Sequence, residues 1–285
     1  MAEIIDGKLV SSTIRSRLAE EIEAFKADSG IVPGLAVVLV GENPASLVYV
    51  RNKKKACEQV GINSYEITFP ADVSEAELLS SIKELNTNPD VHGILVQLPL
   101  PAHINEETVI NAIDPDKDVD AFHPSNVGKI MIGNYTFLPC TPAGIMDLLD
   151  YYNIDVSGKK CVVLGRSNIV GKPMAHLLLE RNGTVTVCHS RTRNLAEETK
   201  CADVLVVAVG KPEFVNADMV KPGAVIIDVG INRTNDGKLV GDVEFSSVSS
   251  VASYISPVPG GVGPMTITTL LKNTFSAAKQ ALLKK

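Results

Sequence analysis

Short apolar runs alternate with amphipathic stretches along almost the whole chain of 285 residues, and this alternation constrains the fold more than any other feature. A near-continuous apolar run such as Leu35–Val40 is typical of a strand that is buried on both faces of a parallel sheet. The stretch after each run has one polar side, as expected of a helix that crosses between neighbouring strands. The pattern begins a second time at Gly158. We therefore predict an α/β fold of two domains, a number that also suits the length.

Each apolar run predicts a strand, and the two series of strands define the two domains. The first series is 35–40, 65–69 and 91–97, and the second is 160–164, 184–188, 203–207 and 224–228. Helices are predicted at about 11–26, after the capping box Ser74-Glu75-Ala76-Glu77, and after Pro139-Cys140-Thr141-Pro142. The last helix, at about 266–283, could return to pack on the first domain. The predicted domains are residues 1–140, completed by 266–285, and residues 141–265.

Charge and composition exclude several classes of partner. The net charge of −6 provides no basic surface for nucleic acid or for an anionic membrane. No run approaches the ~18 apolar residues that span a bilayer, and the first eight residues lack the apolar core of a signal peptide. The cysteines are odd in number, without a close pair or a zinc-like spacing, so we expect reduced thiols in a cytoplasmic protein and no metal site. They are Cys57, Cys140, Cys161, Cys188 and Cys201.

The first strand of the second domain runs into a glycine-containing turn and then a helix, as in the phosphate turn of a Rossmann domain. The turn is Gly165-Arg166-Ser167-Asn168-Ile169-Val170-Gly171-Lys172-Pro173. Its Gly-x-Ser-x-x-x-Gly spacing is a weak match by itself, and a plain tight turn is the alternative. A P-loop fails because five residues, not four, separate Gly165 from Gly171, and because Pro173 stands where a magnesium-binding Ser or Thr is required.

The loop after the next strand favours NADP over NAD. A NAD-binding domain usually has an acid there for the ribose 2′-hydroxyl, but His189-Ser190-Arg191-Thr192 contains none. Ser190, Arg191 and Arg166 offer donors and positive charge that suit a 2′-phosphate. The alternative is that they are ordinary exposed loop residues. Small-residue turns at 208–212 and 229–232 follow later strands and would let a nicotinamide approach the backbone.

A lysine on the apolar side of a helix is the best candidate for chemistry. Asn43-Pro44 predicts the start of a helix that runs to Val60. At about 100° per residue, Lys53 projects from the apolar arc, whereas its neighbours lie opposite. Lys53 is therefore either a surface residue that snorkels or a positioned amine with a shifted pKa. The arc contains Ala45, Tyr49, Val50, Ala56, Cys57 and Val60, and the opposite side contains Arg51, Lys54, Lys55 and Glu58.

Three other segments are candidates for a site. Gln97 ends a wholly apolar strand, where a hydrogen-bonded strand-end amide is the alternative. Asp118 and Asp120 are two residues apart, so both carboxylates can share one face of an extended segment; exposed turn acids are the alternative. The loop 257–266 is dense in glycine and enters the last helix, so its backbone can approach a planar ligand. A simple helix-entry turn is the alternative.

Taken in order along the chain, these motifs resemble one family, the bifunctional methylenetetrahydrofolate dehydrogenase/methenyltetrahydrofolate cyclohydrolases (the FolD family). The resemblance covers essentially the whole chain. It implies an N-terminal catalytic domain, a C-terminal Rossmann-type NADP-binding domain and a last helix that returns to the first domain. The motifs are Tyr49-x-x-x-Lys53, 93–101, Lys117-Asp118-Val119-Asp120, 165–173 and 257–266.

The resemblance also implies an activity and a set of site residues. The enzyme would oxidise 5,10-methylenetetrahydrofolate with NADP and hydrolyse the methenyl product to 10-formyltetrahydrofolate, both in one shared cleft. Lys53 would be the base near the reacting carbon, a role that requires a lowered pKa. Gln97 would orient Lys53, Tyr49 would pack on the folate, and Asp120 would bind the pterin donors. The folate side would include Pro259, Gly260, Gly261, Val262 and Gly263, and NADP would contact Gly165, Arg166, Ser167, Ser190 and Ile231.

One departure and two alternatives remain open. The family usually has glycine where this chain has Ala121, which costs roughly a kcal/mol if that position needs a positive φ; we expect instead that it tolerates a small side chain. A dehydrogenase without cyclohydrolase activity would be expected if Lys53 or Gln97 were replaced, and both are present. A non-catalytic nucleotide-sensing module would not need a buried amine.

The resemblance also implies an oligomeric state. The family forms homodimers through the nucleotide domain, so we expect a homodimer.

Overall fold

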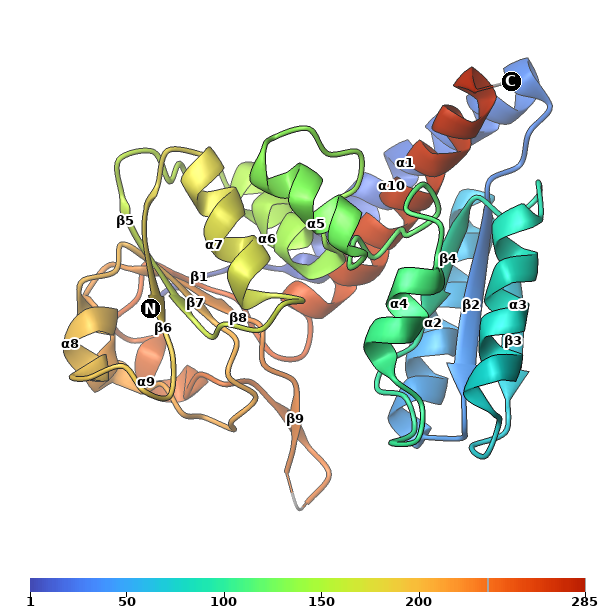
Figure 1. Cartoon of the computed structure of the whole chain (residues 1–285). Coiled ribbons are helices and arrows are strands. Elements are labelled where there is room, and N and C mark those ends of the chain that lie inside the picture. The colour runs from blue at the N-terminus through green and yellow to red at the C-terminus, as the bar shows by residue number, and fades with distance from the viewer. Residues whose placement is uncertain (235, 285) are drawn as a thin grey trace. The chain divides into compact units, whose positions relative to one another are not determined.

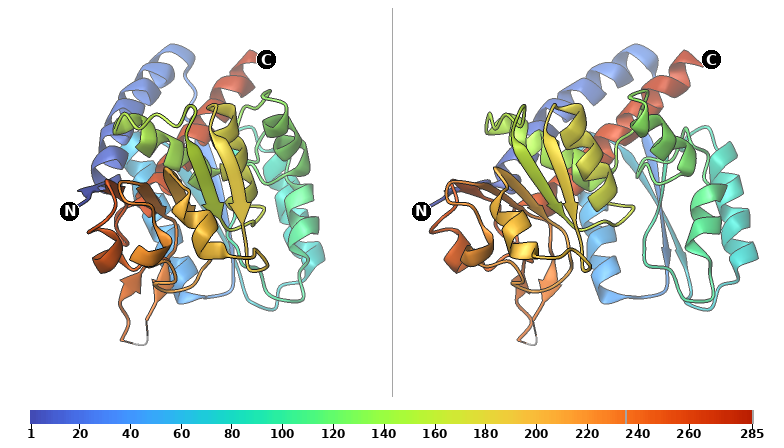
Figure 2. Two further views of the ribbon diagram at one scale, coloured as in Figure 1. Left: turned by 90° about the vertical axis from the view of Figure 1, so that its left-hand side faces the viewer. Right: turned by 60° about the vertical axis from the view of Figure 1, so that its left-hand side comes forward.

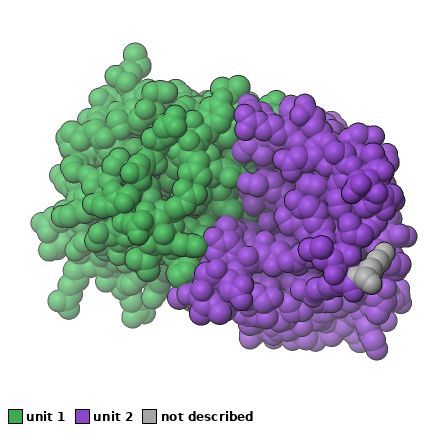
Figure 3. Space-filling model, turned by 90° about the horizontal axis from the view of Figure 1, so that it is seen from above, with its two compact units in different colours: residues 1–12, 140–266 green, residues 13–139, 267–285 purple. Residues whose placement is uncertain are grey.

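The computed structural model describes residues 1–234 and 236–284, apart from the side chains of Pro44 and Ala45, so the predicted position of Ala45 on the apolar arc lies outside the described residues. The chain forms two compact units (Figure 3). Unit 1 consists of residues 1–12 and 140–266, and unit 2 of residues 13–139 and 267–285. Each unit contains a parallel sheet, as the alternation of apolar and amphipathic segments predicts (Figure 1).

Unit 2 is built on a three-stranded parallel sheet with the order β3-β2-β4. Its strands are β2 (Gly34–Val40), β3 (Asn63–Phe69) and β4 (Gly93–Val96), and all seven residues of the central strand β2 are buried. The crossover helices are α2 (Pro44–Val60) and α3 (Glu75–Thr87). The Ser74 hydroxyl accepts the Glu77 N–H at the start of α3, which confirms the predicted cap.

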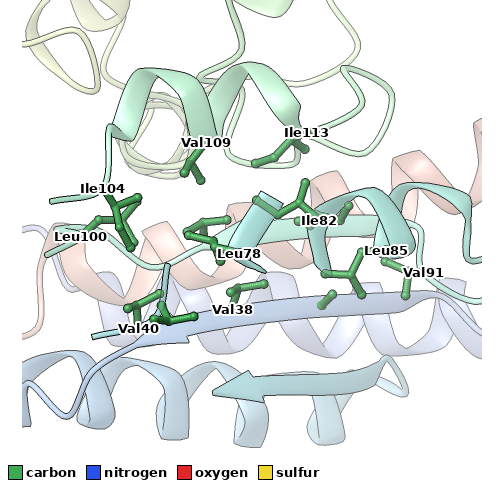
Figure 4. Packing of buried hydrophobic residues seen from close by; sticks show 14 residues of the cluster. Val38, Val40, Leu78, Ile82, Leu85, Val91, Leu100, Ile104, Val109 and Ile113 are labelled. Carbon is green, nitrogen blue, oxygen red and sulfur yellow. The ribbon is translucent and has the colours of Figure 1, made fainter. Parts of the chain in front are cut away.

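The core of unit 2 lies between one face of this sheet and two helices. Val38 and Val40 of β2 point toward Leu78 and Ile82 of α3, and α4 (Glu106–Ala112) adds Val109 above them (Figure 4). α2 lies on the opposite side of the sheet (Figure 4). Helices on both faces explain why β2 is apolar along its whole length rather than at alternate residues.

The last helix, α10 (Val262–Leu283), begins in unit 1 and joins unit 2 from residue 267 onward. In unit 2 it packs beside α1 (Gly7–Ser29), where the rings of Phe25 and Phe275 meet edge to face at 5.3 Å. The Asn273 side-chain amide donates to the carbonyls of Val119 (2.8 Å) and Leu138 (2.9 Å). These contacts confirm that the last helix returns to the first domain.

Unit 1 has a six-stranded, wholly parallel sheet with the order β1-β11-β8-β7-β5-β6. From β5 outward the order reverses direction, as in a doubly wound Rossmann sheet. α7 (Gly171–Glu180) lies beside β5 and β6 (Figure 2). The strands are β1 (Glu3–Ile4), β5 (Lys160–Leu164), β6 (Thr184–Cys188), β7 (Val204–Val207), β8 (Val225–Asp228) and β11 (Tyr254–Ile255).

The N-terminus differs from the prediction. β1 pairs with β11, Ile4 opposite Ile255, so the first twelve residues belong to unit 1 rather than to the first domain. A strand of only two residues carries too little periodicity to be seen in the sequence. The remaining elements are α5 (Pro124–Met131), α6 (Cys140–Tyr151), α8 (Leu195–Lys200), η1 (Ala217–Met219), α9 (Phe245–Val248) and the hairpin of β9 (Asn232–Arg233) and β10 (Leu239–Val240).

Candidate active site

Lys53 is buried in unit 2, with only 8% of its surface exposed. It lies on α2 on the same side as Ser46, Val50 and Cys57, which are also buried. The next two lysines are exposed, and the Lys54 ammonium pairs with Glu66 at 2.9 Å. The helical phase therefore separates Lys53 from its basic neighbours, as the sequence predicts.

Gln97 follows directly after β4 and holds the Lys53 side chain. The Lys53 Nζ donates to Gln97 Oε1 at 2.9 Å, and Gln97 Nε2 donates to the carbonyl of Leu98 at 2.8 Å. The Gln97 backbone N–H donates to the Val38 carbonyl on β2, which ties the residue to the sheet. Because both ends of the amide are engaged, its oxygen is held toward the lysine. The predicted contact between Gln97 and Lys53 is therefore a direct hydrogen bond.

The groups around Lys53 lie in a desolvated environment. Burial raises the pKa of the Cys57 thiol to about 12, against the opposing effects of the Ser64 hydroxyl and of the positive charges of Arg15 and Lys53. Burial also lowers the pKa of Arg15 and raises that of Tyr49, which is half-buried one turn before Lys53. Cys57 is therefore a protonated, unreactive thiol near neutral pH.

The two aspartates do not share one face of an extended segment. The Ala121 N–H donates to the Asp118 carbonyl, so residues 118–121 form a turn. Asp118 is buried, and its carboxylate accepts the His123 N–H and the Asn126 side-chain amide, each at 2.8 Å. Burial raises the pKa of Asp118 despite these bonds. Asp120 is only partly buried, so it is the carboxylate left in reach of a ligand.

Ala121 adopts φ = +58°, in the left-handed region. The position therefore has a positive φ, the case in which alanine rather than glycine carries a strain cost, and the small side chain of alanine occupies it. The residue is fully buried as well. Asp120 is therefore held next to a strained residue, with a cost of about 1–2 kcal/mol.

In unit 1, the turn after β5 leaves no room for side chains at its two glycines. A Cβ on Gly165 would lie 2.2 Å from the Ala208 carbonyl oxygen, and one on Gly171 would lie 2.3 Å from the Gly165 carbonyl oxygen. Gly165 also has φ = +134°. The Ser167 hydroxyl accepts the N–H groups of Val170 and Gly171, so it caps the start of α7. The family resemblance implies that Ser167 contacts NADP, and the structure shows that its hydroxyl is also engaged at the start of α7.

The basic loop residues of unit 1 are exposed. Ser190 and Arg191 follow β6 in a tight turn in which the Arg191 N–H donates to His189 Nδ1 at 3.1 Å. Arg166 is exposed in the turn after β5. Within residues 1–234 and 236–284, neither guanidinium forms an ion pair with an acidic side chain. Both are available to an anion.

The glycine-dense loop packs closely within unit 1. A Cβ on Gly7 would lie 1.7 Å from the Gly261 carbonyl oxygen, and the Gly261 N–H donates to the Pro257 carbonyl. Gly261 and Val262 are buried, whereas Pro259 is exposed. A Cβ on Gly263 would meet the Ile231 side chain at 3.7 Å, so two predicted ligand contacts from different segments lie together.

Two buried carboxylates were missed from the sequence. Asp228 ends β8 and Asp242 follows β10, and both bind backbone N–H groups of the loops beyond β7 and β8. The only sequence signal is an acid at the end of an apolar strand. In the part of the chain that the structure describes, no three His, Cys, Asp or Glu side chains form a potential metal site. None of the helices there is both long and apolar enough to cross a membrane.

Two family models match the chain. One is described as the catalytic domain of tetrahydrofolate dehydrogenase/cyclohydrolase and matches residues 5–120. The other is described as the NAD(P)-binding domain of the same family and matches residues 139–282.

Similar proteins agree with these matches. The chain is 62% identical to the bifunctional protein FolD of Acetivibrio thermocellus over 284 residues and 59% identical to that of Bacillus subtilis over 281 residues, with 99% of each chain covered in both cases. The crystal structure of the Campylobacter jejuni bifunctional enzyme is 50% identical, with a TM-score of 0.96 over 98% of this chain and 99% of that one. The Trypanosoma brucei enzyme, complexed with NADP cofactor and an inhibitor, is 39% identical, with a TM-score of 0.95 over 99% of this chain and 98% of that one.

Proposed function

The chain belongs to the tetrahydrofolate dehydrogenase/cyclohydrolase family, and we propose that it oxidises 5,10-methylenetetrahydrofolate with NADP and hydrolyses the product with Lys53 as the key base. The observation that carries the proposal is the buried Lys53 amine, bonded to Gln97 at 2.9 Å. Burying a lysine costs free energy, and a folded protein keeps such a residue where its amine is needed.

Bound NADP would supply the acceptor for a hydride from the methylene carbon of the folate, and loss of that hydride would leave the folate as a delocalised methenyl cation. Unit 1 has the strand order that binds dinucleotides, with the turn of Gly165, Arg166 and Ser167 at the start of α7. Ser190 and Arg191 would take the 2′-phosphate, and Ile231 would contact the cofactor.

In the cyclohydrolase step, water adds to the methenyl carbon and gives up a proton. The bond from that carbon to N5 then breaks, N5 takes a proton, and 10-formyltetrahydrofolate is released. A neutral Lys53 amine can take the water proton, and both burial and the substrate cation favour the neutral form of an amine. Gln97 accepts a hydrogen bond from Lys53 and leaves the nitrogen lone pair directed elsewhere.

The remaining site residues would bind the folate. The partly buried Asp120 carboxylate suits the amino and ring N–H donors of a pterin, and Tyr49 lies one turn from Lys53 on α2, where its ring can pack on the folate. Gly260 to Gly263, with Pro259, would present backbone to the same ligand. We also propose a cytoplasmic homodimer formed through unit 1; sedimentation of the purified protein tests its mass.

Lys53→Met tests the proposal. Methionine keeps the length of the side chain but cannot accept a proton, so we expect hydrolysis of added methenyltetrahydrofolate to fall at least about 100-fold, within the range of general-base effects. Lys54→Met, one residue on and exposed, is the matched control and should retain activity. Unchanged NADP binding and thermal unfolding would show that the fold is intact. Undiminished hydrolysis by Lys53→Met would refute the role.

The wild-type protein distinguishes the alternatives in one assay. It is incubated with methylenetetrahydrofolate and NADP while NADPH and methenyl absorbance are followed together. A bifunctional enzyme produces NADPH with little methenyl accumulation. An enzyme with dehydrogenase activity alone accumulates the methenyl compound, and a nucleotide-sensing module produces no NADPH.

A further inference from the structure

We propose that Asp242, supported by Asp228, is a positioning residue for the nicotinamide half of the cofactor. This inference rests on the proposed NADP-dependent dehydrogenase activity. The two carboxylates hold the loops that leave the carboxyl ends of β7 and β8 in one conformation, ready for the ring that accepts the hydride.

The Asp242 carboxylate binds the backbone of the loop after β7. One carboxylate oxygen, Oδ2, accepts the N–H groups of Val209 (2.6 Å) and Gly210 (2.8 Å), and Oδ1 accepts that of Lys211 (2.9 Å). Three successive N–H groups directed at one anion form a backbone nest, and Gly210 supplies the left-handed residue with φ = +65°. Asp242 is fully buried, so water does not compete for these bonds.

The same carboxylate also binds the loop after β8. The Asn232 side-chain amide donates to Asp242 Oδ1 at 2.8 Å, which places one anion between the two loops. Asp228, the last residue of β8, accepts the N–H groups of Gly230, Asp242 and Val243, each at 2.9 Å. Asp228 therefore fixes the backbone of Asp242, and Asp242 fixes the two loops.

Two glycines make room for this arrangement. A Cβ on Gly230 would lie 2.3 Å from Asp242 Oδ1, and a Cβ on Gly241 would lie 1.8 Å from Asp228 Oδ2. The backbone thus closes on both carboxylates with no space for a methyl group. A buried acid enclosed in this way holds its surroundings to one geometry, because every alternative leaves a charge without its hydrogen bonds.

The strand order indicates which part of the cofactor these loops face. A Rossmann sheet binds one nucleotide with each half, and the turn after the second strand of the first half holds the adenosine ribose. Here β5 and β6 form that first half. β7 and β8 belong to the other half, so the loops 208–211 and 229–232 would bind the nicotinamide nucleotide. Ile231 is exposed in the second loop. The residues on either side of it are held by the two carboxylates, since Gly230 donates to Asp228 and Asn232 donates to Asp242.

Asp242→Asn is the direct test. Asparagine keeps the shape of the side chain, but its amide N–H group replaces an oxygen that accepts the backbone N–H groups of the nest. We expect the KM for NADP to rise or the dehydrogenase kcat to fall by at least about tenfold. Hydrolysis of added methenyltetrahydrofolate, which uses no cofactor, should stay within twofold of wild type. The affinity for 2′,5′-ADP, which occupies the first half alone, should also stay within twofold. Asp236→Asn, an exposed acid of the β9–β10 hairpin, is the control and should match wild type.

Asn232→Ala is the milder variant if Asp242→Asn does not fold. It removes one donor to Asp242 and leaves the backbone bonds, so the same selective loss should appear at about threefold. Equal losses of 2′,5′-ADP binding or of hydrolysis would mean that the carboxylate only stabilises unit 1 and would overturn the proposal. Unchanged NADP kinetics in both variants would overturn it too. A wild-type protein that does not reduce NADP would instead refute the proposed function.

Discussion

Lys53, Lys54 and Lys55 are chemically identical and differ only in helical phase. Phase puts Lys53 on the buried side of α2, where Gln97 holds it, and leaves the next two in solvent. Exposed lysines gain little from nearby acids, so the Lys54–Glu66 pair needs no functional explanation. Position on the helix, rather than residue type, thus separates the candidate base from two surface residues.

The exposed Arg191 carries the cofactor preference in the proposed function. A charge-assisted hydrogen bond contributes about 1.5–3 kcal/mol, so Arg191→Ala should raise the KM for NADP by about 10- to 100-fold. The KM for NAD, which lacks the 2′-phosphate, should change less than threefold. Steady-state kinetics with both cofactors measure this.

Lys200→Ala, an exposed change at the end of α8, is the control for Arg191→Ala and should leave both constants unchanged. A wild-type enzyme that prefers NAD, or equal effects on the two cofactors, would contradict the 2′-phosphate assignment.

At the scale of elements, the turn at 118–121 decides which of two aspartates is accessible. Extended backbone would have presented both, whereas the turn buries Asp118 against Asn126 and leaves Asp120 partly exposed. Pairing contributes to this outcome, because Asp118 bridges to Ile94 at the start of β4. Spacing in the sequence could not distinguish the two conformations, since both accommodate Asp-Val-Asp.

Substitution of Ala121 tests the strain in that turn. Ala121→Gly relieves about 1–2 kcal/mol of backbone strain but loses a buried methyl and adds flexibility to the unfolded chain, so the free energy of unfolding should change by less than about 1 kcal/mol. Ala121→Val adds a branched side chain at a positive φ in a buried site and should cost about 3 kcal/mol or more. Urea unfolding measures both. Similar stabilities of the two variants would show that this backbone conformation is not strained.

At the scale of the whole molecule, a buried carboxylate of unit 1 makes the stability of the fold depend on pH. In unit 1, burial raises the pKa of Asp228 to about 6, with the nearby Asp242 charge raising it further and three backbone N–H groups opposing. The unfolded chain ionises this group near pH 4. The folded state therefore binds more protons between about pH 4 and 6, and the contribution of Asp228 to stability falls as pH rises through that range.

Unfolding measured at pH 4.5 and pH 7 tests this sign. Relative to Asp228→Asn, whose side chain does not titrate, the wild type should lose on the order of 2 kcal/mol of unfolding free energy between pH 4.5 and pH 7. A parallel pH dependence of the two proteins, or a wild type that gains stability relative to the variant, would contradict the raised pKa. The transition followed should be that of unit 1.

Much of the architecture could be predicted because it depends on local periodicity. The two parallel sheets follow from runs of apolar residues and their spacing, whereas the phosphate turn and the return of the last helix are implied by the family resemblance. β1 could not be predicted, because its two residues form a strand only when β11 is beside them. The unit to which the first twelve residues belong therefore depends on a partner 251 positions away in the chain, since Ile4 pairs with Ile255.

The sequence by itself determined the α/β class, the buried phase of Lys53 and the absence of an acid after β6, because helical phase and strand endings are local properties. The family resemblance, but no local pattern, implied that Gln97 meets Lys53, and the structure shows the contact. Only the tertiary structure decided that Asp118 is buried while Asp120 is not, and that Asp228 and Asp242 bind the loops beyond β7 and β8. Those outcomes depend on backbone donors and strand neighbours that come together from distant parts of the chain, and no local pattern records them.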